Sequence, residues 1–141
     1  MAKVQMMLLG CGKMGSAMLK GWLADPGLNA QYTIIEPYAQ HLGWAGAHQQ
    51  VAIYSDCDAA ILAGTPVSAV IVLAVKPQMM DEAIAEFGPL RDDKTAFLTI
   101  AAGIDTSWLK ARLGAHTLVL RAMPNTPAAI GKGVTALYYD T

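Results

Sequence analysis

A glycine-rich turn, G-x-G-x-x-G at residues 10–15, directly follows the compact apolar run Val4–Leu9. Apolar residues then recur at helical spacing until Asp25-Pro26-Gly27 ends the pattern. Only glycine readily adopts the backbone conformations that so short a turn requires. The beginning of the chain therefore predicts a strand, a tight turn and a helix.

The same alternation continues along the rest of the chain. Further strands are predicted at residues 32–35, 51–54, 69–75, 95–100, 117–123 and 134–139, and further helices at 38–47, 56–63, 78–87 and 106–113. The run 69–75 is continuously apolar, as a strand buried on both faces requires. Alternating elements with short links predict an α/β fold of the Rossmann type, which is a doubly wound, mainly parallel sheet with helices on both faces.

Length and composition limit the other possibilities. The 141 residues have the size of one domain, expected at 1–141, and the formal net charge of -1 provides no field for nucleic acid or an anionic membrane. No apolar run reaches the ~18 residues of a membrane span. Cys11 and Cys57 lack the spacing of a disulfide framework or a zinc site. We therefore expect a cytoplasmic protein with reduced thiols, no metal and a small-molecule partner.

The three glycines of the turn have distinct expected roles. Gly10 permits the tight turn, Gly12 lets the backbone approach a pyrophosphate, and Gly15 lets the helix pack closely on the strand. Free N–H groups at the start of the helix then face the anion. Glu36 follows roughly 20 residues later at the end of the next strand, the spacing of an acid that binds a ribose. This context predicts a dinucleotide site, the alternative being a turn that binds nothing.

Glu36 also bears on which dinucleotide is used. A carboxylate accepts hydrogen bonds from a free 2′-hydroxyl but repels a 2′-phosphate, by about 4 kcal/mol per unit charge at ~4 Å and an effective dielectric near 20. No arginine follows Glu36 to compensate. The sequence therefore favours NADH over NADPH, unless Glu36 is only a solvated residue at a strand end.

Three more segments follow predicted strands, at the sheet edge where doubly wound folds bind ligands. They are A-V-K-P at 74–77, A-A-G at 101–103 and R-A-M-P-N-T-P at 121–127. The small residues at 101–103 leave room for a flat ring or a ribose, and the two prolines of the last segment stiffen a turn that presents Asn125. A solvated Lys76, simple close packing and an ordinary loop are the respective alternatives.

Together, the motifs G-C-G-K-M-G, A-V-K-P, I-A-A-G and R-A-M-P-N-T-P resemble those of the pyrroline-5-carboxylate reductase family in order and spacing. The resemblance covers essentially the whole chain and implies reduction of L-1-pyrroline-5-carboxylate to L-proline by NAD(P)H. It implies that Val75, Lys76 and Ala102 line the ribose and nicotinamide, and that the pyrophosphate is surrounded by Gly10, Gly12, Lys13, Met14 and Gly15. The candidate cofactor-binding residues are Gly10, Cys11, Gly12, Lys13, Met14, Gly15, Glu36, Asp56, Ala74, Val75, Lys76, Pro77, Ala101, Ala102, Gly103 and Asn125.

The chain departs from this family in three respects. Glu36 stands where members often carry a small or polar residue and favour NADPH. Asp56 falls near an asparagine of the family, yet Asp56 or Ser55 is equally well explained as the cap of the helix at 56–63. The family continues into a helical domain that forms the homo-oligomer and most of the substrate pocket. We expect that domain to be absent from this chain, which ends at Thr141, so no catalytic residue is assigned.

Two other functions remain open at this stage. One is a different small oxidoreductase with the same cofactor domain, similar to a 3-hydroxyacid dehydrogenase or to a deazaflavin-dependent NADP reductase. The R-A-M-P-N-T-P motif argues against both. The other is a stand-alone NAD(P)-binding module without catalysis. The three histidines have neither triad nor metal-site spacing, so none is expected to catalyse a reaction.

Overall fold

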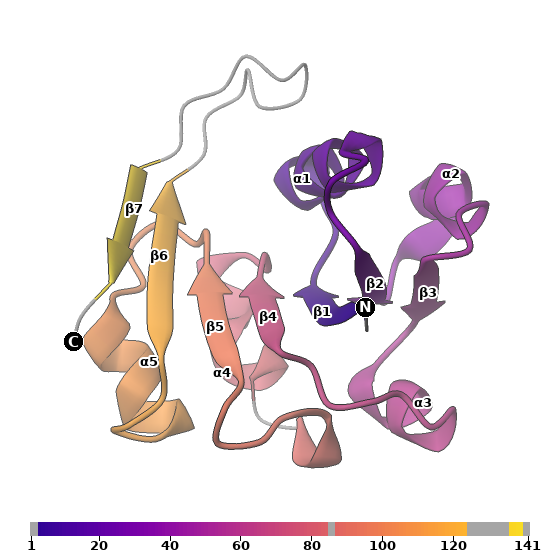
Figure 1. Cartoon of the computed structure of the whole chain (residues 1–141). Helices are drawn as coiled ribbons and strands as arrows, with labels where there is room; N and C mark the ends of the chain where they lie inside the picture. Colours follow the sequence, from indigo (N-terminus) through magenta and orange to yellow (C-terminus); the bar gives the residue numbers. More distant parts are fainter. Residues whose placement is uncertain (1–2, 85–86, 124–135, 140–141) are drawn as a thin grey trace.

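The computed structural model of the chain describes residues 3–84, 87–123 and 136–139. Seven strands form one sheet in the order β3-β2-β1-β4-β5-β6-β7 (Figure 1). All neighbours pair in parallel except β7, which runs antiparallel to β6. The strands are β1 (Val4–Leu9), β2 (Ala30–Ile35), β3 (Val51–Tyr54), β4 (Val70–Leu73), β5 (Ala96–Thr99), β6 (Val119–Met123) and β7 (Ala136–Tyr139). The predicted mainly parallel α/β sheet is therefore confirmed.

Helices cover both faces of this sheet. They are α1 (Lys13–Ala24), α2 (Gly43–Gly46), α3 (Cys57–Leu62), α4 (Met80–Ala83) and α5 (Thr106–Leu113), with short 3-10 turns η1 (Ala39–Leu42), η2 (Pro77–Met79) and η3 (Gly88–Leu90). Figure 1 shows α1 and α2 on one side of the sheet and α3, α4 and α5 on the other. This arrangement is the doubly wound form that the alternating pattern predicts.

Two hydrophobic cores lie on the two faces because successive side chains of a strand point in opposite directions. In β1, Leu8 packs into the core with Leu19 of α1 and Ala45 of α2. Its neighbours on either side, including Leu9, pack into the other core, with Leu109 of α5. The central strands are thus buried on both faces, which explains their continuous apolar sequences.

The structure corrects the helix expected at 78–87. The chain there forms η2 and then the single turn α4, and Gly88, with a φ of +49°, begins η3. In the helix expected at 78–87, Met79, Ala83, Ile84 and Phe87 recur as an apolar stripe at helical spacing. Ile84 and Phe87 are buried, but Met79 is 48% exposed and Met80 is fully buried in its place. Met79 lies in a 3-10 turn, which has three residues per turn rather than 3.6. Its side chain therefore does not face the direction that α-helical spacing predicts.

Other boundaries shift by a few residues. The strand expected at 69–75 is β4, four residues long, and the strand expected at 117–123 begins two residues later as β6. The helix expected at 38–47 is divided between η1 and α2. The helix at 106–113 and the glycine that ends it, Gly114 with a φ of +118°, are confirmed.

Candidate dinucleotide-binding site

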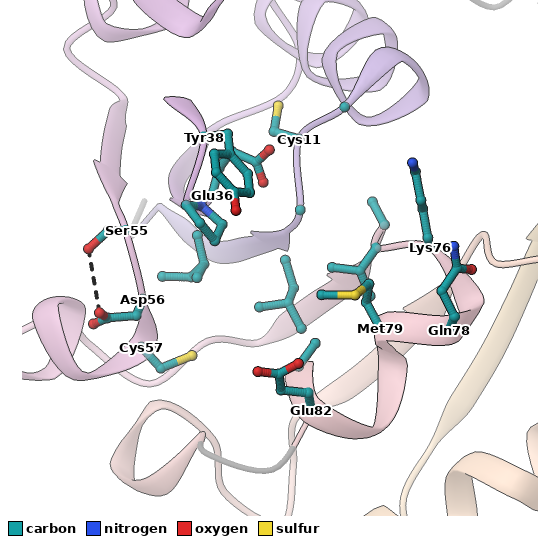
Figure 2. A pocket seen from close by; sticks show the side chains of 18 residues that line it. Cys11, Glu36, Tyr38, Ser55, Asp56, Cys57, Lys76, Gln78, Met79 and Glu82 are labelled. Atoms are coloured by element: carbon teal, nitrogen blue, oxygen red, sulfur yellow. Dashed lines mark hydrogen bonds between the residues drawn. The ribbon is translucent and has the colours of Figure 1, made fainter. Parts of the chain in front are cut away.

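A cavity of about 650 Å³ lies at the carboxyl ends of the central strands (Figure 2). Its walls come from the segments that follow β1, β2, β3 and β4. The sheet order reverses direction at β1, which has β2 on one side and β4 on the other. Doubly wound folds bind their ligands at such a switch point. Of the predicted site residues, the structure brings together Gly10, Cys11, Gly12, Glu36, Asp56, Ala74, Val75 and Lys76.

The remaining predicted site residues lie elsewhere. Residues 13–15 form the first turn of α1, next to the cavity, and Pro77 begins η2. Residues 101–103 follow β5, one strand beyond β4, and are not part of the cavity wall as described. Asn125 lies outside the described residues. A role in cofactor binding stays a prediction for these residues and for those that line the cavity.

Other residues of the wall were not predicted from the sequence to belong to the site. Tyr38, after β2, is 75% exposed, and Met79, after β4, presents its thioether to the same cavity (Figure 2). Glu82 of α4 and Ser55 also line it. For Ser55 and Tyr38 a position shortly after a strand end was the available signal, because the carboxyl ends of parallel strands meet at one edge of the sheet.

Two of the three glycines are required by contacts inside the protein. Gly10 has a φ of +85°, and a Cβ atom there would lie 2.8 Å from Cγ1 of Val75 and 3.0 Å from the carbonyl oxygen of Ala74. A Cβ at Gly15 would lie 3.1 Å from the carbonyl oxygen of Gly10. The tight turn and the close packing of helix on strand, the roles expected of these two residues, are both visible in these contacts.

Gly12 differs, because no described atom lies within 4 Å of the position that its Cβ would occupy. Its φ of -78° is also accessible to any residue. Neither packing nor backbone strain therefore explains a glycine here. Gly12 lines the cavity, so a glycine here leaves its backbone open to close approach by a ligand.

The start of α1 suits an anion. Gly12 is the N-cap of this twelve-residue helix, and within the described chain neither a side-chain cap nor an acidic residue of the first turn occupies its free N–H groups. These groups and the positive end of the helix dipole favour a negative charge. The open space at Gly12 and the uncapped helix together fit a diphosphate.

Cys11, between the two glycines, remains an uncharged thiol. Burial raises the pKa of Cys11 above its ordinary value, the negative charge of Glu36 adds to this increase, and a hydrogen bond with Ser16 opposes it. The fully buried thiol therefore adds no negative charge beside the proposed diphosphate position.

Three carboxylates line the wall of the cavity. Glu36, Asp56 and Glu82 line its wall, together with the ammonium group of Lys76 (Figure 2). Glu36 is held at the end of β2, where its backbone N–H donates to the carbonyl oxygen of Tyr54 over 2.9 Å. This places the predicted ribose-binding acid beside the glycine-rich turn.

Asp56 caps α3, which settles the choice between Asp56 and Ser55. Its Oδ1 accepts a hydrogen bond from the backbone N–H of Ala59 at 2.8 Å. The hydroxyl of Ser55 donates to the other carboxylate oxygen, Oδ2, at 3.5 Å. Asp56 has this structural role whether or not it also contacts a ligand.

We expect Asp56→Ala to lower the free energy of unfolding by about 1 kcal/mol, because a backbone N–H at the start of α3 loses its acceptor. Asp56→Asn keeps an acceptor oxygen and should leave stability nearly unchanged. Urea denaturation of the three proteins measures both effects. Equal losses for the two variants would contradict the capping role.

The described residues contain no helix with both the length and the apolar character needed to cross a bilayer. Within the same residues, no group of three histidine, cysteine or carboxylate side chains is placed to hold a metal ion.

Solved structures share the fold. Pyrroline carboxylate reductase from Plasmodium falciparum, solved with NADP bound, matches 100% of this chain and 50% of its own with a TM-score of 0.77 at 22% sequence identity. Pyrroline-5-carboxylate reductase from Coxiella burnetii matches 99% of this chain and 50% of its own, with a TM-score of 0.78 at 22% identity. Likeness at this level of identity shows the fold alone.

Curated relatives are more similar to this chain in sequence than these solved structures are. Pyrroline-5-carboxylate reductase from Escherichia coli K12 is 32% identical over 130 residues, which are 92% of this chain and 47% of the relative. The Pseudomonas aeruginosa enzyme is 32% identical over 139 residues, 98% of this chain and 49% of the relative. The chain thus spans about half the length of the curated relatives it matches.

The sequence model of a family described as "NADP oxidoreductase coenzyme F420-dependent" matches residues 5–103. This segment runs from β1 to the turn after β5 and is more than half of the chain. The relatives confirm the resemblance inferred from the four motifs. The chain therefore belongs to the NADP oxidoreductase, coenzyme F420-dependent family, and it is similar over nearly its whole length to pyrroline-5-carboxylate reductases.

Proposed function

We propose that this chain is the cofactor-binding half of a pyrroline-5-carboxylate reductase, in which NAD(P)H reduces L-1-pyrroline-5-carboxylate to L-proline. The observation that carries the proposal is the open space at Gly12, beside an uncapped helix end and at the switch point of the sheet. The relatives that match 92% or more of the chain are reductases of this name. A bound nicotinamide supplies the hydride, and the protein binds and orients it.

The cavity divides naturally between the parts of a dinucleotide. The backbone at Gly12 and the start of α1 would hold the diphosphate. Glu36 would accept hydrogen bonds from the adenosine ribose, and the exposed side chains of Tyr38 and Met79 offer apolar surfaces for the adenine ring. Lys76 lies toward the strands where the nicotinamide is expected. There, the turn at 101–103 is the predicted support for the ring.

The complete protein is proposed to need a second, helical half. This chain corresponds to about half of each relative, and the remaining half would supply the substrate pocket and the contacts of a homo-oligomer. We place this protein in the cytoplasm, where nicotinamide cofactors and reduced thiols are available.

Glu36 is proposed to favour NADH over NADPH. The carboxylates of Asp56 and Glu82 in the same wall add to the negative field. A 2′-phosphate near Glu36 would be repelled by about 4 kcal/mol per unit charge at ~4 Å and an effective dielectric near 20. Solvent that enters so open a cavity reduces this figure, so the measured difference should be smaller.

We expect Glu36→Gln to strengthen NADPH binding about tenfold or more, because it removes this repulsion, and to weaken NADH binding only slightly. Titration of intrinsic tryptophan fluorescence with each dinucleotide measures both constants. Asp58→Asn is the matched control, since Asp58 is an exposed carboxylate in the first turn of α3. Tighter binding of NADPH than of NADH by the unchanged protein would show that the proposed preference is wrong.

A chimeric enzyme tests the reductase proposal. This chain would be joined to the remaining half of the Escherichia coli reductase, and L-proline formation measured with NADH and NADPH. Proline formation supports the proposal, whereas a folded, cofactor-binding chimera without activity contradicts it. The chain alone should bind the dinucleotide and form no proline, because the residues that bind the substrate are proposed to lie in the other half.

The family description supports a second candidate, an oxidoreductase that transfers hydride between NADP and the deazaflavin coenzyme F420. Loss of the visible absorbance of F420 on addition of NADPH would demonstrate it. The similarity to pyrroline-5-carboxylate reductases extends beyond residue 103 to nearly the whole chain, which is why the reductase is the first candidate. If the chain binds dinucleotide but neither the chain nor the chimera turns over substrate, the remaining candidate function is a stand-alone binding module.

A further inference from the structure

The carbonyl oxygen of Cys11 receives two side-chain hydrogen bonds. His41 Nε2 lies 2.8 Å from this oxygen and Ser16 Oγ lies 3.3 Å from it. His41 belongs to η1, thirty residues further along the chain. The pairing of β1 with β2, which places Leu9 opposite Ile35, brings η1 beside the glycine-rich turn. The glycine-rich turn is therefore held by a residue from the neighbouring strand connection.

These contacts fix the direction of one peptide group. In a planar trans peptide the carbonyl oxygen of residue 11 and the N–H of residue 12 point in opposite directions. His41 and Ser16 line a second cavity, of about 410 Å³, together with Lys13, Ala17, Lys20 and Trp44. The Cys11 carbonyl is drawn toward that side, so the Gly12 N–H is directed away from it. Gly12 itself lines the larger cavity, where the diphosphate is proposed to bind.

Because residue 12 is a glycine, the preceding peptide group needs these hydrogen bonds to keep one orientation. Glycine adopts positive and negative φ with similar ease, so the peptide between residues 11 and 12 has little intrinsic preference for one orientation. A reversed peptide would present a carbonyl oxygen to the phosphates in place of an N–H donor. A Cβ atom at position 12 would limit this rotation, but it would also fill the space that the proposed ligand needs.

We propose that His41 is a positioning residue, which donates from Nε2 to the Cys11 carbonyl and thereby directs the Gly12 N–H toward the diphosphate of the bound dinucleotide. The acceptor is a carbonyl, so the ring must carry its proton on Nε2. Ser16 provides a longer, weaker second bond to the same oxygen. This inference rests on the proposed function, because it assigns a role within the same site.

The test compares ligands with and without a diphosphate. His41→Ala should raise the dissociation constants of NADH and of ADP-ribose about tenfold, the order of effect of one hydrogen bond to a charged group. The dissociation constant of adenosine should change less than about twofold. His41→Gln can place a side-chain N–H near the position of Nε2, so it should restore most of the affinity. His48→Ala, an exposed histidine in the bend after α2, is the matched control and should change nothing.

Nuclear magnetic resonance gives a second reading that does not depend on affinity. In the unmodified protein, ADP-ribose should shift the Gly12 amide resonance strongly, and in His41→Ala this shift should shrink. Urea denaturation of each variant confirms that it is folded. If His41→Ala is too unstable for titration, Ser16→Ala and His41→Gln provide the same comparison with smaller effects.

The outcomes separate this inference from the proposed function. Equal losses of ADP-ribose and adenosine affinity in His41→Ala would mean a general structural effect and would overturn the positioning role. Unchanged ADP-ribose affinity would overturn it as well. If the unmodified protein binds neither NADH nor NADPH, the proposed function fails first.

Discussion

Alanine in place of Gly12 is expected to weaken NADH binding by about 10- to 100-fold, or about 1.4 to 2.8 kcal/mol. The new methyl group would occupy the open space beside the backbone, where no described atom lies within 4 Å, and would hold the diphosphate away from the N–H groups of α1. The fold itself should tolerate the change. Alanine is a poorer N-cap than glycine, which lowers the free energy of unfolding by about 1 kcal/mol at most.

Fluorescence titration with NADH and urea denaturation, performed on the same preparation of Gly12→Ala, measure the two effects separately. Adenosine should bind almost as well as it does to the unmodified protein, because it lacks the diphosphate. An undiminished affinity for NADH would mean that the diphosphate does not approach position 12, and the main argument for the cofactor site would be lost.

Gly10→Ala should produce the opposite result, a large loss of stability of about 2 to 5 kcal/mol. The φ of +85° costs a residue with a Cβ about 1 to 2 kcal/mol. The 2.8 Å contact with Cγ1 of Val75 and the 3.0 Å contact with the Ala74 carbonyl oxygen add the cost of overpacking, about 1 to 3 kcal/mol. Urea denaturation measures the sum.

The double variant Gly10→Ala/Val75→Ala separates the two causes. Removing Cγ1 of Val75 relieves one of the contacts but leaves the unfavourable φ, so the combined loss should be smaller than the sum of the single losses. Strictly additive losses would contradict the crowding seen at Val75. Alanine substitutions at two glycines of one motif are thus expected to have different effects. Gly12→Ala should weaken dinucleotide binding, and Gly10→Ala should lower the free energy of unfolding.

The sequence predicted those features that depend on local pattern. The apolar runs at β1 and β4 predicted strands that the structure contains, and the glycine-rich turn after β1 has its positive φ at Gly10, where the motif requires it. Glu36 stands at the end of β2 as its spacing indicated. Since parallel strands align their carboxyl ends, these local predictions were sufficient to locate the cavity.

Features that depend on irregular turns and on distant contacts were missed. Met79 was assigned to an apolar helical stripe because an α-helical period was assumed, whereas the chain begins that segment with a 3-10 turn and Met79 is exposed. Tyr38 was expected to begin a helix, whereas it lies exposed in the link between β2 and η1. The bond from His41 to the Cys11 carbonyl joins residues thirty positions apart, and sequence alone does not give the path of η1 beside β1.

The antiparallel strand β7 determines at which edge of the sheet the described chain ends. β1 starts at the amino edge of the parallel strands, and β7, because it runs against β6, finishes at that same edge (Figure 1). The cavity lies at the opposite edge. A biosensor surface or a fluorescent label attached before β1 or after β7 would therefore leave the mouth of the cavity clear for dinucleotide.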